Sequence, residues 1–564
     1  MEYLQNYDPL GNAVLSTLMA ALPILTLLYL LALHPRRRSD GSLHMGIEAH
    51  HAAIIAVIVA FFVSWIGFKM PPGIAGVSLL YGALYGLFPI GAIVVAAMFL
   101  YTITLVSGSF EVVKRSVATI SDDKRIQAIV IAFSFGAFIE GAAGFGTPVA
   151  ISGALMVGLG FRPLEAAILC LIANTAPVAF GAVGAPIVGL QGVTGIDPVL
   201  IGKMAARQLP FFSLIVPIWM TAVQVRMDRK PWRCVWEVWP ALLVSGGSFA
   251  IAQFVMGNYV GYMLVDIVGG VVSMAAVAIF VKFWKPPRHY DGDDYKPAAN
   301  IQHPTRGQMF LAWLPWLLLS VMVFVWGYEK AWIDKLPGAI AKISVPVVHG
   351  HVYRMPPVVP QQTLDGAIYT LDWLSRPPMA ILIAALISGL LAGLSVQQWI
   401  TVVVRTAQRM RIPLLCISLI LGMGFITKYS GMDAVLGLAF TKTGAAYPFF
   451  AAMLGWLGVA LTGSDTSSNV MFGSMQKITA EQLHLPVLLI TTANSTGGVM
   501  GKMIDAQSIV VATAACYEDR QEGKMAVGPI FRGVFVHSIV LAMLMGLLVW
   551  LQANYWTWMV PPWP

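Results

Sequence analysis

Six consecutive polar residues, SDTSSN at 464–469, interrupt an apolar stretch of this chain. A second interruption, GAAGFGTP at 141–148, has glycines and a proline in place of most polar side chains. A helix that stops in a hydrocarbon environment leaves backbone N–H and C=O groups without partners, and these groups can bind anions and cations. The hydroxyls of Ser464, Thr466 and Ser467 can also bind carboxylate or hydroxyl oxygens. Both interruptions therefore predict helix tips that line a polar cavity.

Four ionisable residues lie inside otherwise uncharged apolar stretches: Glu140, Asp465, Lys502 and Asp505. A charge at the centre of a membrane costs at least roughly 2.5 kcal/mol, so it marks a substrate path, a proton relay or a partner of opposite charge. A buried Glu140 or Asp465 could carry a proton. Lys502 could bind a carboxylate, or it could pair with Asp505, three residues further along the same helix. The sequence leaves these two roles of Lys502 open.

Polar residues at matching places in two apolar stretches complete the candidate site. Asn174 and Asn494 are the main pair. The alternative explanation for these segments is close helix packing through small residues, which is frequent in membranes. Packing does not require six consecutive polar residues, which favours a binding site. The predicted substrate-binding residues are Gly144, Gly146, Thr147, Asn174, Thr175, Ser464, Thr466, Ser467, Asn494, Ser495, Thr496 and Lys502. The predicted proton-coupling residues are Asp465 and Glu140.

The composition indicates the class of protein. Of the 564 residues, 58% are hydrophobic and only 11% are charged, and the mean hydropathy is +0.75. Such a chain has too little polar surface to cover a soluble globule of its size, which indicates a polytopic membrane protein. The formal charge of +8 does not indicate a nucleic-acid partner, because Lys and Arg lie in short loops between apolar segments.

The sequence predicts neither a cofactor nor a metal site. The motif GAAGFG lacks both the spacing and the preceding strand of a dinucleotide-binding loop. The four cysteines do not have the spacing of a disulfide framework or a zinc site. A membrane-embedded enzyme would need an Asp-rich metal motif or clustered histidines near the interface, and the histidines here lie mainly in loops. We therefore expect a protein that is not an enzyme.

Apolar stretches of roughly 20 residues, the length that crosses a membrane, define the elements that would position the site. The expected fold is an all-α polytopic membrane protein with about 12 full spans. Ten unbroken spans are expected at 14–33, 47–68, 88–106, 207–225, 234–254, 258–281, 309–327, 377–395, 412–427 and 529–551. Segments 74–87 and 397–410 precede the spans that start at Pro89 and Pro413, and each is suited to lie along the membrane surface.

The two interruptions belong to an internal repeat. Residues 461–475 align without a gap under residues 141–155, and Asn494 aligns under Asn174. In each copy, a stretch too polar to span would enter the membrane and return as a helical hairpin, and a broken helix would follow it. The hairpins are expected at 126–160 and 446–482, and the broken helices at 164–186 and 485–512.

The spans before each hairpin make the two copies inverted. Three spans lead from the N-terminus to the first hairpin, and three spans of opposite direction lead from Arg306 to the second. This pattern predicts two inverted repeats, 1–230 and 306–564, joined by linking spans and a loop in 231–305. Inverted repeats with discontinuous helices are typical of secondary transporters, whose substrate site lies near the middle of the membrane.

Basic residues in the loops give the expected orientation. The loops with Arg36 to Arg38, Lys114 to Arg125, Arg226 to Arg233 and Lys282 to Arg306 are expected in the cytoplasm. The loop 328–376 and both termini are then outside. No basic segment precedes the first apolar run, so we expect a retained helix there rather than a cleaved signal.

The sequence resembles the L-lactate/glycolate permease family at these residues and beyond them. The motifs that carry the resemblance are QNYDPLGN, FIEGAAGFGTPVAI, NTAPVAFGA, VTGID, ARQLPF, RMPPVV, GWLGVALTGSDTSSN and ANSTGGVMGKMI. The resemblance implies a secondary active transporter in a bacterial cytoplasmic (inner) membrane. It would import L-lactate and related 2-hydroxymonocarboxylates, such as glycolate and D-lactate, by proton symport. The family is also similar to elevator-type ion transporters with paired hairpins and broken helices.

Alternatives within and outside this class stay open. A sodium-coupled carboxylate transporter fits as well, since hydroxyls and the carbonyls of broken helices also bind Na⁺. A channel would need a continuous pore, and the inverted halves argue against one. The expected partners are a small-molecule carboxylate, a proton and membrane lipid, and the sequence is compatible with either a monomer or a homodimer.

Overall fold

The computed structural model describes residues 2–32, 34–37, 43–45, 47–144, 146–288, 290 and 304–562. The expected loop residue Arg38, Phe145 of the GAAGFG motif and much of the loop 282–306 lie outside this part of the chain. Within it, 11 helices are long and apolar enough to cross a membrane, or up to 13 if each of two bent helix pairs is one span. The expected number of about 12 agrees with this range.

The helices before the first hairpin follow the expected order. They are α1 (Ala13–Ala32), α2 (Ala49–Phe62) with its continuation η1 (Val63–Gly67), α3 (Pro72–Tyr85), η2 (Gly86–Gly91), α4 (Ala92–Val106) and α5 (Ser109–Ala118). Phe88 has extended backbone angles, φ −140° and ψ 124°. The helical chain is therefore interrupted directly before Pro89, where the sequence predicts a boundary.

The first interrupted region folds back on itself. Its elements are α6 (Lys124–Ala128), η3 (Ile129–Phe135), α7 (Gly136–Ala143) and α8 (Thr147–Gly158). The Ser152 hydroxyl of α8 donates to the Ile131 carbonyl of η3 at 3.0 Å, so the two elements run antiparallel. Gly144 and Gly146 at the tip have φ of 60° and 77°, a left-handed conformation that glycine adopts without strain.

A bent helix pair follows this hairpin. It consists of α9 (Pro163–Ala173), η4 (Val178–Phe180) and α10 (Gly181–Thr194), and its two parts are bent by 65°. Ala182 and Val183 have φ of 45° and 55°. This left-handed backbone is strained for residues with a side chain, and such strain concentrates at functional sites. Helices α11 (Pro198–Ala205) and α12 (Leu209–Met227) come next.

The linking spans hold the first hairpin in place. Their elements are α13 (Arg233–Trp236), α14 (Trp239–Val255), η5 (Met256–Val260), η6 (Tyr262–Leu264) and α15 (Val265–Phe283). The buried hydroxyl of Ser273 lies 2.8 Å from that of Ser134 in η3 and 3.1 Å from that of Ser245 in α14. Hydroxyl contacts of this kind join helices in membranes, where apolar surfaces gain little from contact with one another.

Two expectations for the second half are wrong. Its first helices are α16 (Arg306–Tyr328), α17 (Lys330–Ile333), α18 (Pro377–Leu391) and α19 (Val396–Ser430). Segments 397–410 and 412–427 are not separate elements, because α19 is one helix of 35 residues that continues through Pro413. Membrane helices tolerate proline where neighbouring groups satisfy the freed carbonyl. The expected span 377–395 is α18, a helix of 15 residues that is shorter than a full span.

The second interrupted region also folds back. Its elements are α20 (Met432–Phe440), η7 (Thr441–Ala446), α21 (Tyr447–Thr462) and α22 (Asp465–Gln482). The Gln476 amide of α22 donates to the Ala451 carbonyl at 3.0 Å, and the Ser468 hydroxyl donates to the Gly455 carbonyl at 3.2 Å. Partners that lie progressively further from the tip on both helices show that α21 and α22 are antiparallel.

The second bent pair breaks further along than the first. It consists of α23 (Val487–Gly501), η8 (Lys502–Ile504) and α24 (Ala506–Cys516), bent by 43°, and is followed by α25 (Arg520–Asn554) and η9 (Thr557–Met559). Asp505 caps α24 at the break. Asn494 therefore lies in the interior of a helix, whereas Asn174 is the C-cap residue of α9.

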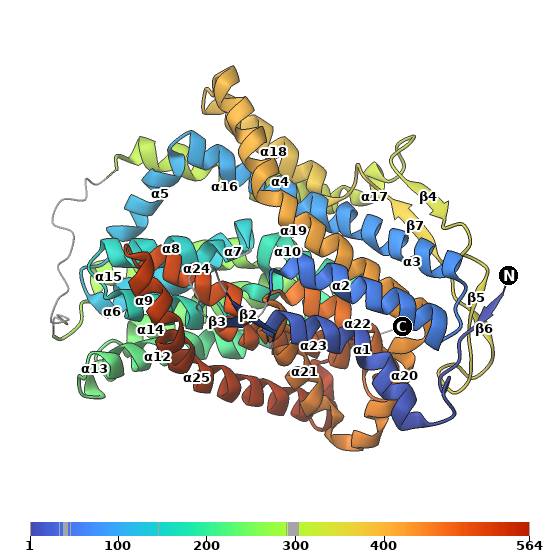
Figure 1. Ribbon diagram of the computed structural model, residues 1–564. Helices are drawn as coiled ribbons and strands as arrows, with labels where there is room; N and C mark the ends of the chain where they lie inside the picture. Colours follow the sequence, from blue (N-terminus) through green and yellow to red (C-terminus); the bar gives the residue numbers. More distant parts are fainter. Residues whose placement is uncertain are drawn as a thin grey trace.

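Short strands make the described fold mostly, rather than entirely, helical. They are β1 (Tyr3–Leu4), β2 (Pro35–Arg37), β3 (Leu43–Met45), β4 (Ala341–Ser344), β5 (Val352–Arg354), β6 (Thr363–Leu364) and β7 (Ile368–Leu371). Strand β5 pairs in parallel with β1 and antiparallel with β6. The N-terminal segment and the loop 328–376 therefore lie together at one end of the protein (Figure 1).

Charged residues gather at the opposite end, where Figure 1 shows α6 and α13. Buried Lys124 bridges Glu165 of α9 (2.9 Å) and Asp228 after α12 (3.1 Å). Arg125 pairs with Glu237 at 3.1 Å. These contacts bring the loops 114–125 and 226–233, both expected in the cytoplasm, to the same end of the protein.

Candidate functional site

The first hairpin tip contacts helices of both halves. A Cβ added to Gly144 would lie 3.0 Å from that of Ala182, in the first helix break. A Cβ added to Gly146 would lie 3.7 Å from the Val511 side chain of α24. The tip therefore lies between the first break and the helix that follows the second break.

The second hairpin tip occupies the matching place. A Cβ on Gly463, which ends α21, would lie 2.9 Å from the Asp505 carboxylate in the second break. Thr466 lies against α10, since a Cβ on Gly189 would come within 2.9 Å of its methyl group. Both tips and both breaks thus meet in one region, and the predicted site residues lie there.

Several predicted hydroxyl residues make local hydrogen bonds. The Ser464 hydroxyl accepts the N–H of Ser467 at 3.2 Å and so caps α22. The Thr175 hydroxyl donates to the Ile172 carbonyl at 2.7 Å, and the backbone N–H of Thr147 donates across the first tip at 3.0 Å. The lone pairs of the Thr175 hydroxyl are not used in this bond.

Asp465 is buried at the start of α22. One carboxylate oxygen accepts the Ser495 hydroxyl at 2.5 Å and the Asn469 amide at 3.4 Å. Its other oxygen has no hydrogen-bond partner among the residues that the structure describes. The sequence predicts that this carboxyl group belongs to the site. In the structure, one of its oxygens is free to bind a proton or to accept a hydrogen bond.

Asn494 belongs to a network of buried amide groups. Its Nδ2 donates to Oδ1 of Asn469 at 2.9 Å, and its Oδ1 accepts from Gln476 at 2.8 Å. Asn469 in turn donates to the Pro186 carbonyl of α10 at 3.1 Å. The network therefore ties the second hairpin to both α23 and the first broken helix.

Thr496 extends the polar contacts to further helices. Its hydroxyl donates to Gln208 at 2.7 Å, and Gln208 donates to Gln552 of α25 at 2.8 Å. The sequence does not suggest this link, because its three residues come from segments far apart in the chain.

Lys502 is paired, which decides an alternative that the sequence leaves open. Its ammonium group donates to the Gly463 carbonyl at 2.5 Å and lies 3.3 Å from the Asp505 carboxylate. The other Asp505 oxygen accepts the N–H of Ser508 at 2.7 Å. Lys502 therefore joins the end of α21 to the start of α24, and a direct contact with substrate stays a prediction.

Glu140 and Asn174 lie together beside the first break. The Glu140 carboxyl is packed against Gly181, where a Cβ would overlap it, and Asn174 is its neighbour. Within the described structure, one Glu140 oxygen and both polar atoms of the Asn174 amide have no hydrogen-bond partner. Lys502 and Asp505 are close enough to act on Glu140 electrostatically.

The sequence reading missed Asp266. This residue lies in the first turn of α15, is fully buried, and packs against Gly141 of the first hairpin. Neither of its carboxylate oxygens has a partner among the described residues. The signal in the sequence is a lone acid within the expected span 258–281.

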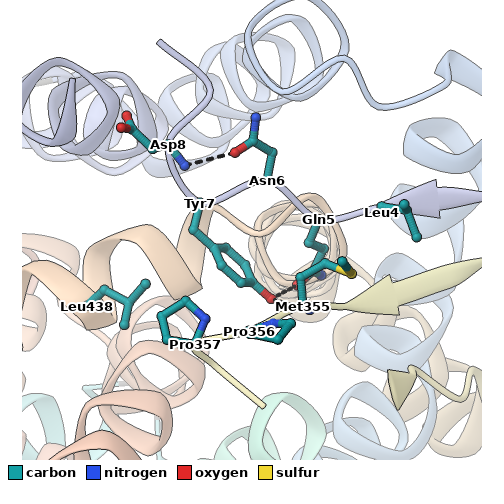
Figure 2. Close-up of a pocket in the computed structure, with 9 residues that line it drawn as sticks. All are labelled: Leu4, Gln5, Asn6, Tyr7, Asp8, Met355, Pro356, Pro357 and Leu438. Carbon is teal, nitrogen blue, oxygen red and sulfur yellow. Dashed lines mark hydrogen bonds between the residues drawn. The ribbon is translucent and has the colours of Figure 1, made fainter. Parts of the chain in front are cut away.

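A separate pocket of about 500 Å³ opens at the end that carries the N-terminal segment. Figure 2 shows its lining, in which the Tyr7 hydroxyl donates to Gln5 and accepts the N–H of Met355. Prolines and apolar side chains make up much of the remaining wall, and none of the predicted site residues lines it. We therefore do not assign the substrate site to this pocket.

Metal-ligating side chains cluster away from the hairpin tips. Glu48, His50 and His51 form the one group in the described residues whose ligand atoms lie within 4.8 Å of one another. They stand at the start of α2 and are exposed or half-buried. The candidate site itself contains carboxylates, amides and hydroxyls.

A helical membrane protein with polar groups buried at helix breaks has the features of a membrane transporter rather than of an enzyme. The chain belongs to the L-lactate permease family, since residues 16–555 match the model of that family. It is 43% identical to the glycolate permease GlcA of Escherichia coli strain K12, over 99% of each chain. It is 42% identical to the L-lactate permease of Salmonella typhimurium, over 99% of each chain, and to that of Bacillus subtilis, over 100% of each.

Among solved structures, the chain is similar to Neisseria gonorrhoeae MtrF, described as illuminating a class of antimetabolite efflux pumps. The TM-score is 0.42 and the sequence identity 13%, over 96% of this chain and 95% of the other.

Proposed function

We propose that this protein imports L-lactate and related 2-hydroxymonocarboxylates by proton symport. Relatives named as L-lactate and glycolate permeases support the substrate class. The balance of charge at the site is the observation that supports coupling to protons. Four buried carboxyl groups meet one ammonium group, and that ammonium is paired with Asp505.

An anionic substrate would be repelled by unpaired carboxylates in a low-dielectric site. Protonation of Asp465 or Glu140 removes this repulsion, because a neutral carboxyl group costs far less to bury than a charged one. Binding of proton and substrate would then favour each other, which is the thermodynamic requirement for symport. In this proposal Asp465 is the first proton carrier and Glu140 the second candidate.

The substrate carboxylate and its neighbouring hydroxyl need N–H groups, amides and hydroxyls around them. We assign the first side of this cradle to Gly144, Gly146, Thr147, Asn174 and Thr175. The second side would be Ser464, Thr466, Ser467, Ser495, Thr496 and Lys502, with the Asn494 amide held in the hydrogen-bond network behind them. Of the two asparagines, Asn174 is the stronger candidate, because its amide is not engaged by other described residues.

The proposed architecture is a pair of inverted repeats, 1–230 and 306–564, that move substrate by an elevator-type motion in the bacterial inner membrane. Strand pairing between the N-terminal segment and the loop 328–376 supports the same side for both, which is the outside in the proposed orientation. A cysteine introduced at exposed Thr363 should react with an impermeant maleimide on intact cells. Reaction only after permeabilisation would reverse the orientation.

Uptake of labelled L-lactate into proteoliposomes tests the function. An inward proton gradient should drive accumulation, and a sodium gradient without one should not. Accumulation that follows sodium instead would favour the sodium-coupled alternative, since the unpartnered oxygens of Glu140 and Asp465 also suit Na⁺. Glycolate and D-lactate, added as competitors, define the substrate range.

A matched pair of variants tests the role of Asp465. Asp465→Asn should abolish proton-driven accumulation and keep lactate exchange, because the amide resembles the protonated carboxyl group. Asp433→Asn is the control, since Asp433 is an equally buried acid at a different place, in α20. Uphill uptake that is unchanged in Asp465→Asn would exclude this residue as the proton carrier.

A further inference from the structure

Asp266 is a buried acid whose place in the fold has no structural explanation so far. It comes from the linking spans, outside both proposed repeats, and its exposed fraction is 0%. Near the start of a helix, a carboxylate gains from the helix dipole. That gain does not supply hydrogen bonds, and neither Asp266 oxygen has a partner in the described part of the chain.

The backbone of the first hairpin makes room for this carboxyl group. A Cβ on Gly141 would lie 2.7 Å from the Asp266 Cβ and 2.9 Å from the Ile267 nitrogen. Only a residue without a side chain permits this approach. Asp266 is thereby held against the residue that follows Glu140, and the two carboxyl groups are close enough to interact electrostatically.

Unpartnered polar atoms concentrate at this place. Five of them belong to three residues: one oxygen of Glu140, both oxygens of Asp266 and both polar atoms of Asn174. Each residue is at least nine-tenths buried. Buried polar groups in native proteins almost always have partners, so a cluster of orphaned atoms indicates a bound species.

The charged surroundings limit what this species is. Glu140 faces Asp266 from α7, and Tyr262 is the titratable residue on η6, which precedes α15. Beyond Glu140 lie Asp465 and the Lys502–Asp505 pair. Two neighbouring carboxylates that are both ionised and buried would repel each other, and one proton between them removes most of that repulsion.

We propose that Glu140 and Asp266 share one proton and form a proton-binding pair separate from Asp465. Uptake forms one O–H bond on either carboxyl group and changes the charge of the pair from −2 to −1. Release returns the proton to water. Asn174 stands beside the pair, so its amide can donate to the carboxylate that remains. The use of this proton in transport rests on the proposed symport, whereas its presence does not.

Infrared difference spectra of the full-length protein between low and high pH test the pair directly. A protonated carboxyl group has a carbonyl stretching band well separated from carboxylate bands. We expect such a band in the wild type, its loss in Asp266→Asn, and its shift or loss in Glu140→Gln. It should persist in Asp465→Asn and in the control Asp433→Asn.

Two results would overturn the proposal. One is a set of protonated-carboxyl bands that Asp266→Asn leaves unchanged, because Asp266 would then be ionised. The other is a band of Asp266 that Glu140→Gln does not affect, because the proton would then not be shared. Either result is independent of whether transport is driven by protons.

Transport measurements separate this proposal from the proposed function. In proteoliposomes, Asp266→Asn should lower proton-driven lactate accumulation about 10-fold and leave exchange within about 3-fold. If the wild type shows the expected bands but no proton-driven uptake, symport is rejected and the proton-binding pair is still supported. Proton-driven uptake that Asp266→Asn does not reduce would reject a role of the pair in coupling.

Discussion

Both hairpin tips reverse the chain between two helices, but they use different residues to do so. At the second tip, Ser464, Asn469 and Asn494 are hydrogen-bonded within the protein, and Lys502 is paired with Asp505. At the first tip the turn is made of glycines, and the polar groups beside it lack partners in the described structure. Polar groups at equivalent positions of the two halves therefore differ in whether they are free to bind a ligand.

This difference in hydrogen bonding predicts that one tip contributes mainly to stability and the other mainly to binding. A network of hydrogen bonds between side chains holds helices together, and removal of one member leaves others unpaired. A buried group without a partner contributes little to the fold and is available to a ligand or a proton. We therefore expect variants near the second tip to lose stability and variants near the first tip to lose affinity.

Of the variants that test this comparison, Lys502→Met should have the largest effect on stability. It leaves the Asp505 carboxylate buried without its cation, which costs about 3–5 kcal/mol. Thermal unfolding in detergent should show a large loss, and the double variant Lys502→Met/Asp505→Asn should recover part of it. The exposed Lys342→Met in β4 is the control. A melting temperature unchanged in Lys502→Met would mean that the pair does not stabilise the second tip.

Asn494→Ala should cost about 1–3 kcal/mol of stability, because Asn469 and Gln476 each lose a buried partner. Transport affinity and the lactate-induced shift in melting temperature should stay at wild-type values in the protein that remains folded. Weaker affinity together with normal stability would instead show that Asn494 contacts the substrate.

Asn174→Ala should behave in the opposite way. Its amide makes no hydrogen bond of good geometry with the described residues and has the Glu140 carboxyl group as its neighbour, so the melting temperature without ligand should change little. Apparent affinity for L-lactate should fall roughly 5- to 100-fold, as expected for the loss of one buried polar contact. If this variant unfolds earlier and still binds lactate normally, the comparison between the two tips fails.

Thr175→Val should have the smallest effect, and it is specific for the substrate. The Thr175 hydroxyl already donates to Ile172, so it can only accept, and a 2-hydroxyl group is the donor that lactate offers. Affinity for lactate should fall about 5-fold, the effect of roughly 1 kcal/mol. Affinity for propionate, which lacks the hydroxyl, should not change. Equal losses for both acids would exclude this contact.

Much of the fold could be predicted because it depends on short-range signals. Glycines at 144 and 146 and six polar residues at 464–469 indicate chain reversals in apolar surroundings, and antiparallel helices meet there. Pro413 was misleading, because a proline signals a helix end in water but is tolerated inside a membrane helix. The extended conformation at Phe88 shows the expected break at the equivalent proline.

Most residues of the site could be predicted from the sequence, but their roles could not. Burial of Glu140, Asp465, Lys502 and Asp505 follows from the apolar residues around them. Whether an amide is free or engaged depends on partners supplied by other helices, such as Gln476 for Asn494. Asp266 belongs to the site only through its packing against Gly141, which depends on how α15 and the hairpin are placed in three dimensions.

The pairing of β1 with β5 has a consequence for biosynthesis. Tyr3 aligns with Val352, and its hydroxyl donates to the carbonyls of Phe68 and Ser430. A ribosome makes Tyr3 more than 400 residues before Ser430, its last partner along the chain. Helices α1 and α2 can enter the membrane long before this strand finds its place. Strand β1 is therefore made well before its partners and can settle only after the helix that carries Ser430 is in place.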